Sequence, residues 1–297
     1  MNDRGLPTAE LLAKIRSLQL KTEVVVDGVL GGLHKSPQHG SSIEFAEHKE
    51  YSQGDEVRHI DWKAYGRLDR YYVKKFEDET NLRAYLVVDG SGSMGYGGEG
   101  SVVKLDHASV LAAALCYILI RQQDSPSLLT FAEKIRSYLP PRSVSGHFEE
   151  ISRDLAKLAP TGETNLAGPI EFLVETLRGR NLVIIFSDLF DHANDVVKLL
   201  ARLRARRNDV VVFHTLHPDE LRFNFEHLTQ FEDMESDDRV LADPEAIRRE
   251  YLTQFLGWAD ALGRSLQDQG VEYVRVDISV PPENTLLAFL RTRGAKR

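Results

Sequence analysis

The chain has 297 residues, of which 42% are hydrophobic and 28% are charged, and its formal net charge is −8 at pH 7. This composition is typical of a globular protein with one large or two smaller domains, and the acidic balance argues against a nucleic-acid-binding surface. Because no signal-peptide pattern and no run of about 18 apolar residues is seen, we expect a cytoplasmic protein without a membrane span.

The first 80 residues are predicted to form an N-terminal region with a small β-rich subdomain. Residues 7–20 carry apolar side chains at helical spacing and predict an amphipathic helix, and the apolar run that follows is interrupted by Gly31 and Gly32. The stretch from Tyr51 to Arg70 is dense in charged, aromatic and turn residues. We interpret this stretch as a subdomain braced by half-buried ion pairs, with a partner-binding face as the alternative.

Residues 81–297 are predicted to form an α/β domain, because short apolar runs alternate there with helical patterns. This alternation favours a mostly parallel, Rossmann-like central sheet flanked by helices. An acidic insertion at about 217–250 is expected to form a surface hairpin and loop. The predicted strands are residues 84–89, 127–131, 134–139, 182–187, 210–216 and 272–276. The predicted helices are residues 104–121, 147–158, 166–178, 193–206, 251–269 and 283–291.

Hard oxygen ligands follow the first strand and return in two later loops. The first loop offers a carboxylate and two hydroxyls at alternating positions, the second a threonine, and the third an aspartate directly after a buried strand. If the sheet is parallel, these loops can converge at its carboxyl edge, where ligands bind in open α/β folds. Such a donor set suits Mg²⁺ or Mn²⁺. The candidate metal ligands are Asp89, Ser91, Ser93, Thr164 and Asp188.

The first loop also has the glycine spacing of a dinucleotide-binding fingerprint, Gly90-x-Gly92-x-x-Gly95. In that fingerprint the helix opens at the glycines, so that its N-terminus meets the pyrophosphate. Here several more residues precede any helical periodicity, and no acidic residue is suitably placed for the ribose. These two differences argue against dinucleotide binding and favour a metal-binding loop, with an ordinary turn as the alternative.

The three loops resemble the metal-ion-dependent adhesion site of von Willebrand factor A-type domains, which reads Asp-x-Ser-x-Ser, then Thr, then Asp. The chain resembles still more closely a bacterial family named domain of unknown function 58, over roughly residues 20–295. The motif that carries this second resemblance is Tyr51-x-x-Gly54-Asp55-x-x-Arg58-x-Ile60-Asp61-Trp62-Lys63, followed downstream by Ser187-Asp188. The resemblance implies a von Willebrand-like domain behind a small β-rich region, and partnership with MoxR-type AAA+ ATPases.

We therefore expect a metal-dependent protein-interaction module, adaptor-like or co-chaperone-like, and not an enzyme. Two carboxylates would neutralise the ion while the hydroxyls leave it electrophilic, so that a partner's acidic side chain can complete the shell. The alternative is a magnesium-dependent phosphoester hydrolase that uses the same ion, with Glu163 or Asp191 as the candidate base.

Other reactive side chains are expected to have structural roles. Cys116 lies in an apolar helical pattern, so we expect it in the core, and as a lone cysteine it favours a reducing compartment. His107, His147 and His192 lack metal-ligand spacing and are predicted to have surface or capping roles.

Overall fold

The computed structural model describes residues 9–34, 48–50, 72–74, 82–97, 102–144, 146–190, 193–236 and 238–294. They belong to two compact units, one formed by Met1–Leu33 with Leu82–Arg297 and the other by His34–Asn81. In the smaller unit, β1 (His48–Glu50) pairs antiparallel with β2 (Tyr72–Lys74). The charged stretch from Tyr51 to Arg70 lies outside the described residues, so its predicted ion pairs stay a prediction.

The larger unit is built on a six-stranded sheet with the order β10-β7-β6-β3-β4-β5. All neighbouring strands are parallel except β4 and β5, which are antiparallel. The sheet begins in its middle with β3, continues through β4 to β5 at one edge, and then runs from β6 beside β3 through β7 to β10 at the other edge. The strands are β3 (Arg83–Asp89), β4 (Ser125–Phe131), β5 (Ile135–Leu139), β6 (Leu182–Ser187), β7 (Asp209–Leu216) and β10 (Glu272–Asp277). This order confirms the predicted Rossmann-like α/β class, and it creates a switch point between β3 and β6.

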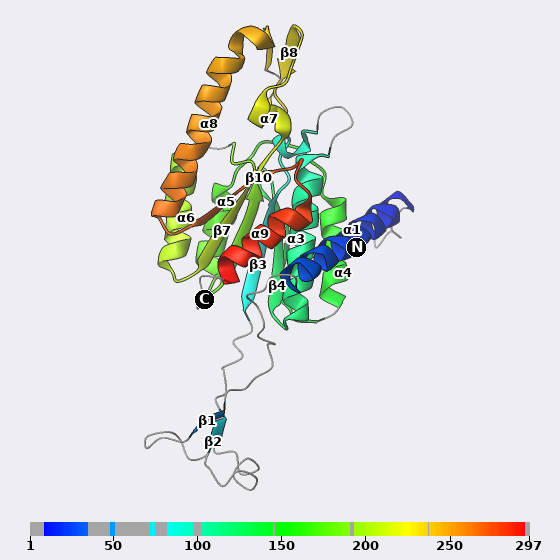
Figure 1. Cartoon of the computed structure of the whole chain (residues 1–297), viewed down its shortest axis with the longest axis vertical. Helices are drawn as coiled ribbons and strands as arrows, with labels where there is room; N and C mark the ends of the chain where they lie inside the picture. Colours follow the sequence, from blue (N-terminus) through cyan, green and yellow to red (C-terminus); the bar gives the residue numbers. More distant parts are fainter. Residues whose placement is uncertain are drawn as a thin grey trace, which may run out of the picture. The chain divides into compact units, whose positions relative to one another are not determined.

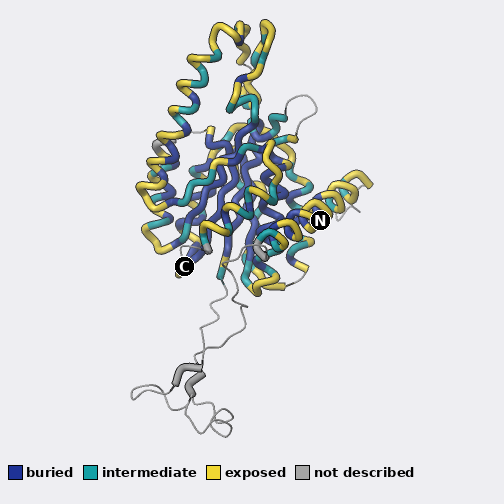
Figure 2. Tube along the Cα trace, viewed as in Figure 1, coloured by how far each residue is buried: buried dark blue, intermediate teal, exposed yellow. Residues whose placement is uncertain are grey.

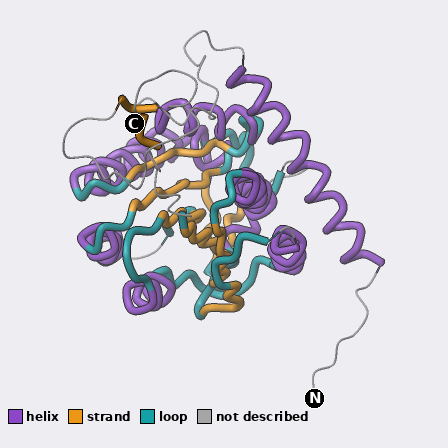
Figure 3. Tube along the Cα trace, turned by 90° about the horizontal axis from the view of Figure 1, so that it is seen from below, coloured by secondary structure: helices purple, strands orange, loops and turns teal. Residues whose placement is uncertain are grey.

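Helices cover both faces of this sheet (Figure 3). One face packs against α1 (Ala9–His34), α3 (Lys104–Arg121), α4 (Gly146–Lys157) and α9 (Pro282–Gly294). The other face packs against α5 (Ala167–Thr176), α6 (Ala193–Ala205) and α8 (Pro244–Asp268). The faces differ because side chains alternate along a strand.

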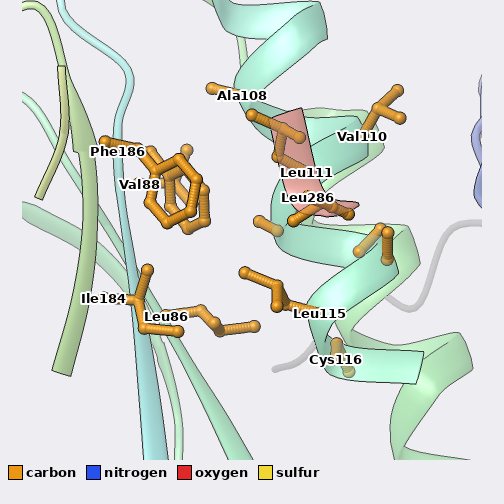
Figure 4. Packing of buried hydrophobic residues seen from close by; sticks show 14 of the residues in the cluster. Leu86, Val88, Ala108, Val110, Leu111, Leu115, Cys116, Ile184, Phe186 and Leu286 are labelled. Atoms are coloured by element: carbon orange, nitrogen blue, oxygen red, sulfur yellow. The ribbon is translucent and has the colours of Figure 1, made fainter. Parts of the chain in front are cut away.

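The central strands show this alternation directly. Leu86 and Val88 of β3 lie in the core on the α3 face, whereas Val87 lies in the core on the opposite face. Figure 4 shows the strand side chains opposite those of α3, with Cys116 on the same helix. Cys116 is fully buried, so its predicted core position is confirmed.

The first helix differs from the sequence prediction. It runs without a break from Ala9 to His34 and packs its buried valines into the main core, so it belongs to the larger unit and not to a separate N-terminal region. Two of its glycines allow close contact with α9. A Cβ atom on Gly32 would lie 2.8 Å from Leu287 Cδ2, and one on Gly28 would lie 3.3 Å from Glu283 Cβ. In the sequence, the smaller unit of residues 34–81 follows α1 and precedes β3.

The insertion at 217–250 contains a short helix, the expected hairpin, and the beginning of α8. The elements are α7 (Pro218–Arg222), β8 (Thr229–Glu232) and β9 (Arg239–Ala242), the last two being antiparallel. Helix α8 begins at Pro244 and not at the predicted residue 251, because Asp243 caps it by accepting a hydrogen bond from the Glu245 amide. The hairpin and the first turns of α8 lie beyond the carboxyl edge of the sheet (Figure 1), and most of their residues are exposed (Figure 2).

Candidate metal and protein-binding site

The first and third loops meet where β3 and β6 end. The register pairs Val88 with Phe186, which places Asp89 beside Ser187. One carboxylate oxygen of Asp89 accepts a hydrogen bond from Ser187 Oγ at 2.6 Å, and the other accepts one from the Ser91 amide at 2.9 Å. Ser91 Oγ in turn lies 3.2 Å from Ser93 Oγ. The acid and both hydroxyls of the predicted first loop therefore lie together at the switch point.

The second loop is joined to the first by backbone hydrogen bonds. The Gly92 amide donates to the Gly162 carbonyl at 2.8 Å, and the Thr161 amide donates to the Gly90 carbonyl at 3.0 Å. The loop turns at Gly162, whose φ of 74° lies in the left-handed region that favours glycine. These bonds bring Thr164 to the same edge of the sheet.

Burial opposes the ionisation of the Asp89 carboxyl group. Its side chain is fully buried, and burial is the main reason that the pKa of Asp89 is raised to about 7, with the nearby charge of Asp188 raising it further. The hydrogen bonds from Ser187 and Ser91 act in the opposite direction but do not cancel this effect. A bound cation would favour the ionised carboxylate, so the electrostatics of Asp89 suit a cation site.

Asp188 is held by a lysine. Its carboxylate accepts a hydrogen bond at 2.7 Å from Lys104 Nζ, which also donates to Glu220 Oε1 at 2.7 Å. The Lys104 side chain is only 1% exposed and lies 5.1 Å from the centre of the Phe190 ring. Burial alone would lower the pKa of Lys104, but the two carboxylates raise it above its ordinary value. The third loop turns sharply after Asp188, at Leu189, whose φ is 57°.

A third carboxylate reaches the site from the hairpin. Glu235, in the turn between β8 and β9, accepts hydrogen bonds from Thr164 Oγ1 at 2.7 Å and from the Thr164 amide at 2.8 Å. The Ser93 amide also donates to Glu235, at 3.3 Å. The turn holds Glu235 through Asp233, whose carboxylate accepts a hydrogen bond from the Glu235 amide at 2.8 Å. One carboxylate of the chain thus contacts both the first and the second loop.

The donor chemistry fits a hard divalent cation. In the described part of the chain, no group of three or more His, Cys, Asp or Glu side chains is arranged to hold a metal ion, so an ion here would need the hydroxyls of Ser91, Ser93 and Thr164 as well. Asp89 and Glu235 contact these loops, Asp188 lies near Asp89, and Lys104 joins Asp188 to Glu220, so the region holds four carboxylates and one ammonium group. The excess of negative charge would favour a cation, and the charge of Lys104 would weaken its binding.

The glycine fingerprint has another explanation in the structure. A Cβ on Gly90 would lie 2.7 Å from Leu158 Cδ1, and one on Gly95 would lie 2.8 Å from Pro160 Cγ. A Cβ on Gly92 would overlap the carbonyl oxygen of Met234. The chain itself therefore approaches these glycines closely, and α3 begins only at Lys104. Neither feature suits a dinucleotide pyrophosphate at a helix N-terminus.

Sequence reasoning identified the loops but missed three charged residues, Lys104, Glu220 and Glu235. Lys104 carried a weak signal, because a cation in the first turn of a helix is opposed by the helix dipole and needs a partner. Its partners are 84 and 116 residues away, so the sequence did not reveal them.

The histidine prediction was wrong for His107 and His147, which are both buried. His147 Nε2 lies 3.0 Å from the Pro126 carbonyl oxygen, and its ring braces the start of α4 against β4. His192 lies outside the described residues.

A comparison with protein families shows to which family the chain belongs. The family described as "Protein of unknown function DUF58" matches residues 47–256, which is more than two thirds of the chain. The chain belongs to this family. Uncharacterised proteins of Mycobacterium bovis (Mb1516) and Mycobacterium tuberculosis (Rv1480) are each 29% identical to it over 215 residues, covering 71% of this chain and 67% of theirs.

Solved structures show more distant likeness to this DUF58 protein. An aerotolerance-related membrane protein from Bacteroides fragilis aligns over 73% of this chain and 100% of its own, at 16% identity and a TM-score of 0.49. The VWA domain of SpRpn10 aligns over 69% and 93%, at 10% identity and a TM-score of 0.37. At such scores the fold assignment rests on the strand order of the chain itself. None of the helices in the described ranges combines the length and apolarity needed to cross a membrane.

Proposed function

We propose that this DUF58 protein is a protein-interaction module that binds a partner's carboxylate through Mg²⁺ or Mn²⁺. The observation that supports this most is the buried carboxylate of Asp89, which lies among hydroxyl donors where three loops meet at the switch point. A second observation agrees with it. Thr164 and Ser93 already receive a carboxylate, that of Glu235, so this edge of the sheet accepts an acidic group.

Five residues would hold the ion, and they divide into two kinds. Asp89 and Asp188 supply negative charge, while the hydroxyls of Ser91, Ser93 and Thr164 supply neutral oxygens. When bound, the cation would attract an acidic side chain of the partner. Lys104 keeps Asp188 in position and offsets part of its charge, so Asp89 contributes most of the charge that remains for the ion.

The metal is tested by calorimetry and thermal unfolding. Mg²⁺ is expected to bind saturably and to raise the melting temperature, because a ligand of the native state stabilises it by linkage. Asp89→Ala is expected to abolish both effects. Asp195→Asn, which changes an exposed carboxylate on α6, is the matched control and is expected to respond like the wild type. Equal responses in Asp89→Ala and the wild type would contradict the proposal.

The partner is proposed on the family resemblance. We infer a MoxR-type AAA+ ATPase, or a client delivered to it, as the source of the acidic side chain, with this chain acting as its adaptor in the cytoplasm. Co-purification of such an ATPase is expected to be lost in EDTA and restored by Mg²⁺. If co-purification is unchanged by EDTA and by Asp89→Ala, the ATPase is a partner but the metal does not take part in its binding.

The hydrolase alternative would use the same ion. Glu163 is exposed and lines an open hollow together with Thr164 and Glu235, so it is available as a general base, whereas Asp191 lies outside the described residues. Magnesium-dependent release of phosphate from p-nitrophenyl phosphate, lost in Glu163→Gln, would favour this alternative over the interaction module.

A further inference from the structure

The tip of the β8–β9 hairpin sits on the candidate site. Glu235 is half-buried there, and its carboxylate is bound by Thr164 from the second loop and by the Ser93 amide from the first. Thr164 and Ser93 belong to the proposed ligand set. An acidic side chain from a partner would have to reach the same donors, so Glu235 stands where that acid would arrive.

The tip of the hairpin can approach the first loop closely because Gly92 has no side chain. The carbonyl oxygen of Met234 lies so near Gly92 that a Cβ there would overlap it, although the αR backbone of Gly92 (φ −56°, ψ −44°) is one that alanine adopts readily. Asp233 adds to the fit by holding the Glu235 amide. The sequence thus shapes both sides of this contact, the turn and the loop beneath it.

Strand β8 and the segment before it are held by other contacts. Phe223 packs on Tyr251 of α8 with ring centroids 4.3 Å apart and on Phe231 of β8 at 5.5 Å. Arg248 donates to the backbone carbonyls of Phe223 and Phe225. At the tip, Asp233, Met234 and Ser236 are exposed. The turn from Asp233 to Ser236 can therefore leave the site while β8 stays packed through Phe231 on Phe223, which contacts α8.

We propose that Glu235 is a built-in competitor for the partner's carboxylate, and that the hairpin tip must leave before a partner's acid can bind. The inference rests on the proposed function, because it takes the partner's acid to bind at Thr164 and Ser93. A group on the same chain competes at an effective concentration on the order of millimolar. A single free carboxylate therefore binds poorly while the tip is seated.

Hydrogen exchange tests the contact between Glu235 and Thr164 without any metal. In Glu235→Ala the Thr164 amide loses a charged acceptor, so it is expected to exchange about tenfold faster than in the wild type. Gly92→Ala keeps the carboxylate but pushes Met234 away, and the same increase is expected. Glu232→Ala changes an exposed acid of the same hairpin that pairs with Arg239, and it is the matched control with unchanged exchange. Unchanged Thr164 exchange in both Glu235→Ala and Gly92→Ala overturns the proposal.

Acetate then serves as the probe for a partner's carboxylate. With Mg²⁺ present, amide NMR of Glu235→Ala is expected to show saturable shifts at Ser93 and Thr164 on acetate addition, with at least about tenfold weaker binding in the wild type. Equal acetate affinity in wild type and Glu235→Ala overturns the inference. Mg²⁺ binding is measured by calorimetry in the same samples. If neither protein binds Mg²⁺, the proposed function is contradicted. If both bind Mg²⁺ and bind acetate with equal affinity, only the role of Glu235 is contradicted.

Discussion

Asp89 and Asp188 lie one residue apart in register at the carboxyl ends of neighbouring strands, yet the protein treats their charges in opposite ways. Asp89 is the last residue of β3 and Asp188 directly follows β6, both side chains are fully buried, and the two strands are neighbours in the sheet. Asp188 is paired with the ammonium group of Lys104, which Glu220 also contacts. Asp89 is held by a serine hydroxyl and an amide, and its pKa is raised to about 7.

The difference shows that a ligand motif does not fix the role of each ligand. Two aspartates that look alike in the motif differ because a lysine from α3 reaches only one of them. An acid that is neutralised inside the protein holds the geometry of a site, whereas an acid left among neutral donors is the one that gains most from a cation.

The largest effect is expected for Lys104→Met. The substitution leaves the buried Asp188 and the half-buried Glu220 without their cation, and breaking a buried pair in this way costs about 4 kcal/mol in the free energy of unfolding. Denaturant unfolding measures the loss. Lys198→Met, which removes an exposed pair with Asp195, is the control and is expected to change stability by less than about 0.5 kcal/mol. A loss for Lys104→Met no larger than for this control would show that the pair does not hold Asp188.

Much of the fold was accessible from the sequence. The strands β3 and β6 and the helix α3 were predicted almost to the residue, because uninterrupted apolar runs and a long helical period are strong local signals. Helix α1 was predicted too short, since the packing of Gly28 and Gly32 against α9 depends on contacts far apart in the chain. The start of α8 was missed despite its cap at Asp243, because the acidic segment before it obscured the helical period.

The site was only partly accessible for the same reason. The loops of Asp89 and Asp188 could be found because the end of a parallel strand is a local feature that places them at one edge, and the loop of Thr164, between α4 and α5, was found by its residue types. Lys104 and Glu235 could not, because each is defined by contacts with residues more than 70 positions away. The metal-binding role of the five predicted ligands stays a prediction until Mg²⁺ binding is measured.

His107 is a buried titratable group on the same helix as Lys104. Its Nε2 atom has no hydrogen-bond partner within the described part of the chain. Burial lowers the pKa of His107 to about 4, and the charge of Asp277 offsets only part of this effect. The unfolded chain therefore binds the proton first as the pH falls from 6.5 to about 4. Over this window the native state is expected to lose about 3 kcal/mol of stability, with no further loss below it.

Urea unfolding of the wild type and of His107→Met as a function of pH checks this expectation. Carboxylates that titrate in the same window contribute to both proteins and cancel in the difference. His227→Gln, which changes an exposed histidine, is the control and is expected to follow the wild type. Parallel curves for wild type and His107→Met would mean that His107 is charged, or accessible to water, in the native state.

The smallest effect, and the one that separates the two acids most directly, is expected for Asp89→Asn without metal. Above pH 7 the wild type carries the buried charge of Asp89, and asparagine removes it while keeping the shape of the side chain. The asparagine oxygen still accepts from the Ser91 amide, and the Ser187 hydroxyl can rotate to accept from the new NH₂ group. We therefore expect a gain of about 2 kcal/mol in metal-free stability, together with loss of the Mg²⁺-induced thermal shift. Asp188→Asn is expected to destabilise the protein instead, because Lys104 then loses a charged partner. A loss of stability in both variants would mean that Asp89 is already neutralised in the native protein, and the contrast between the two acids would no longer hold.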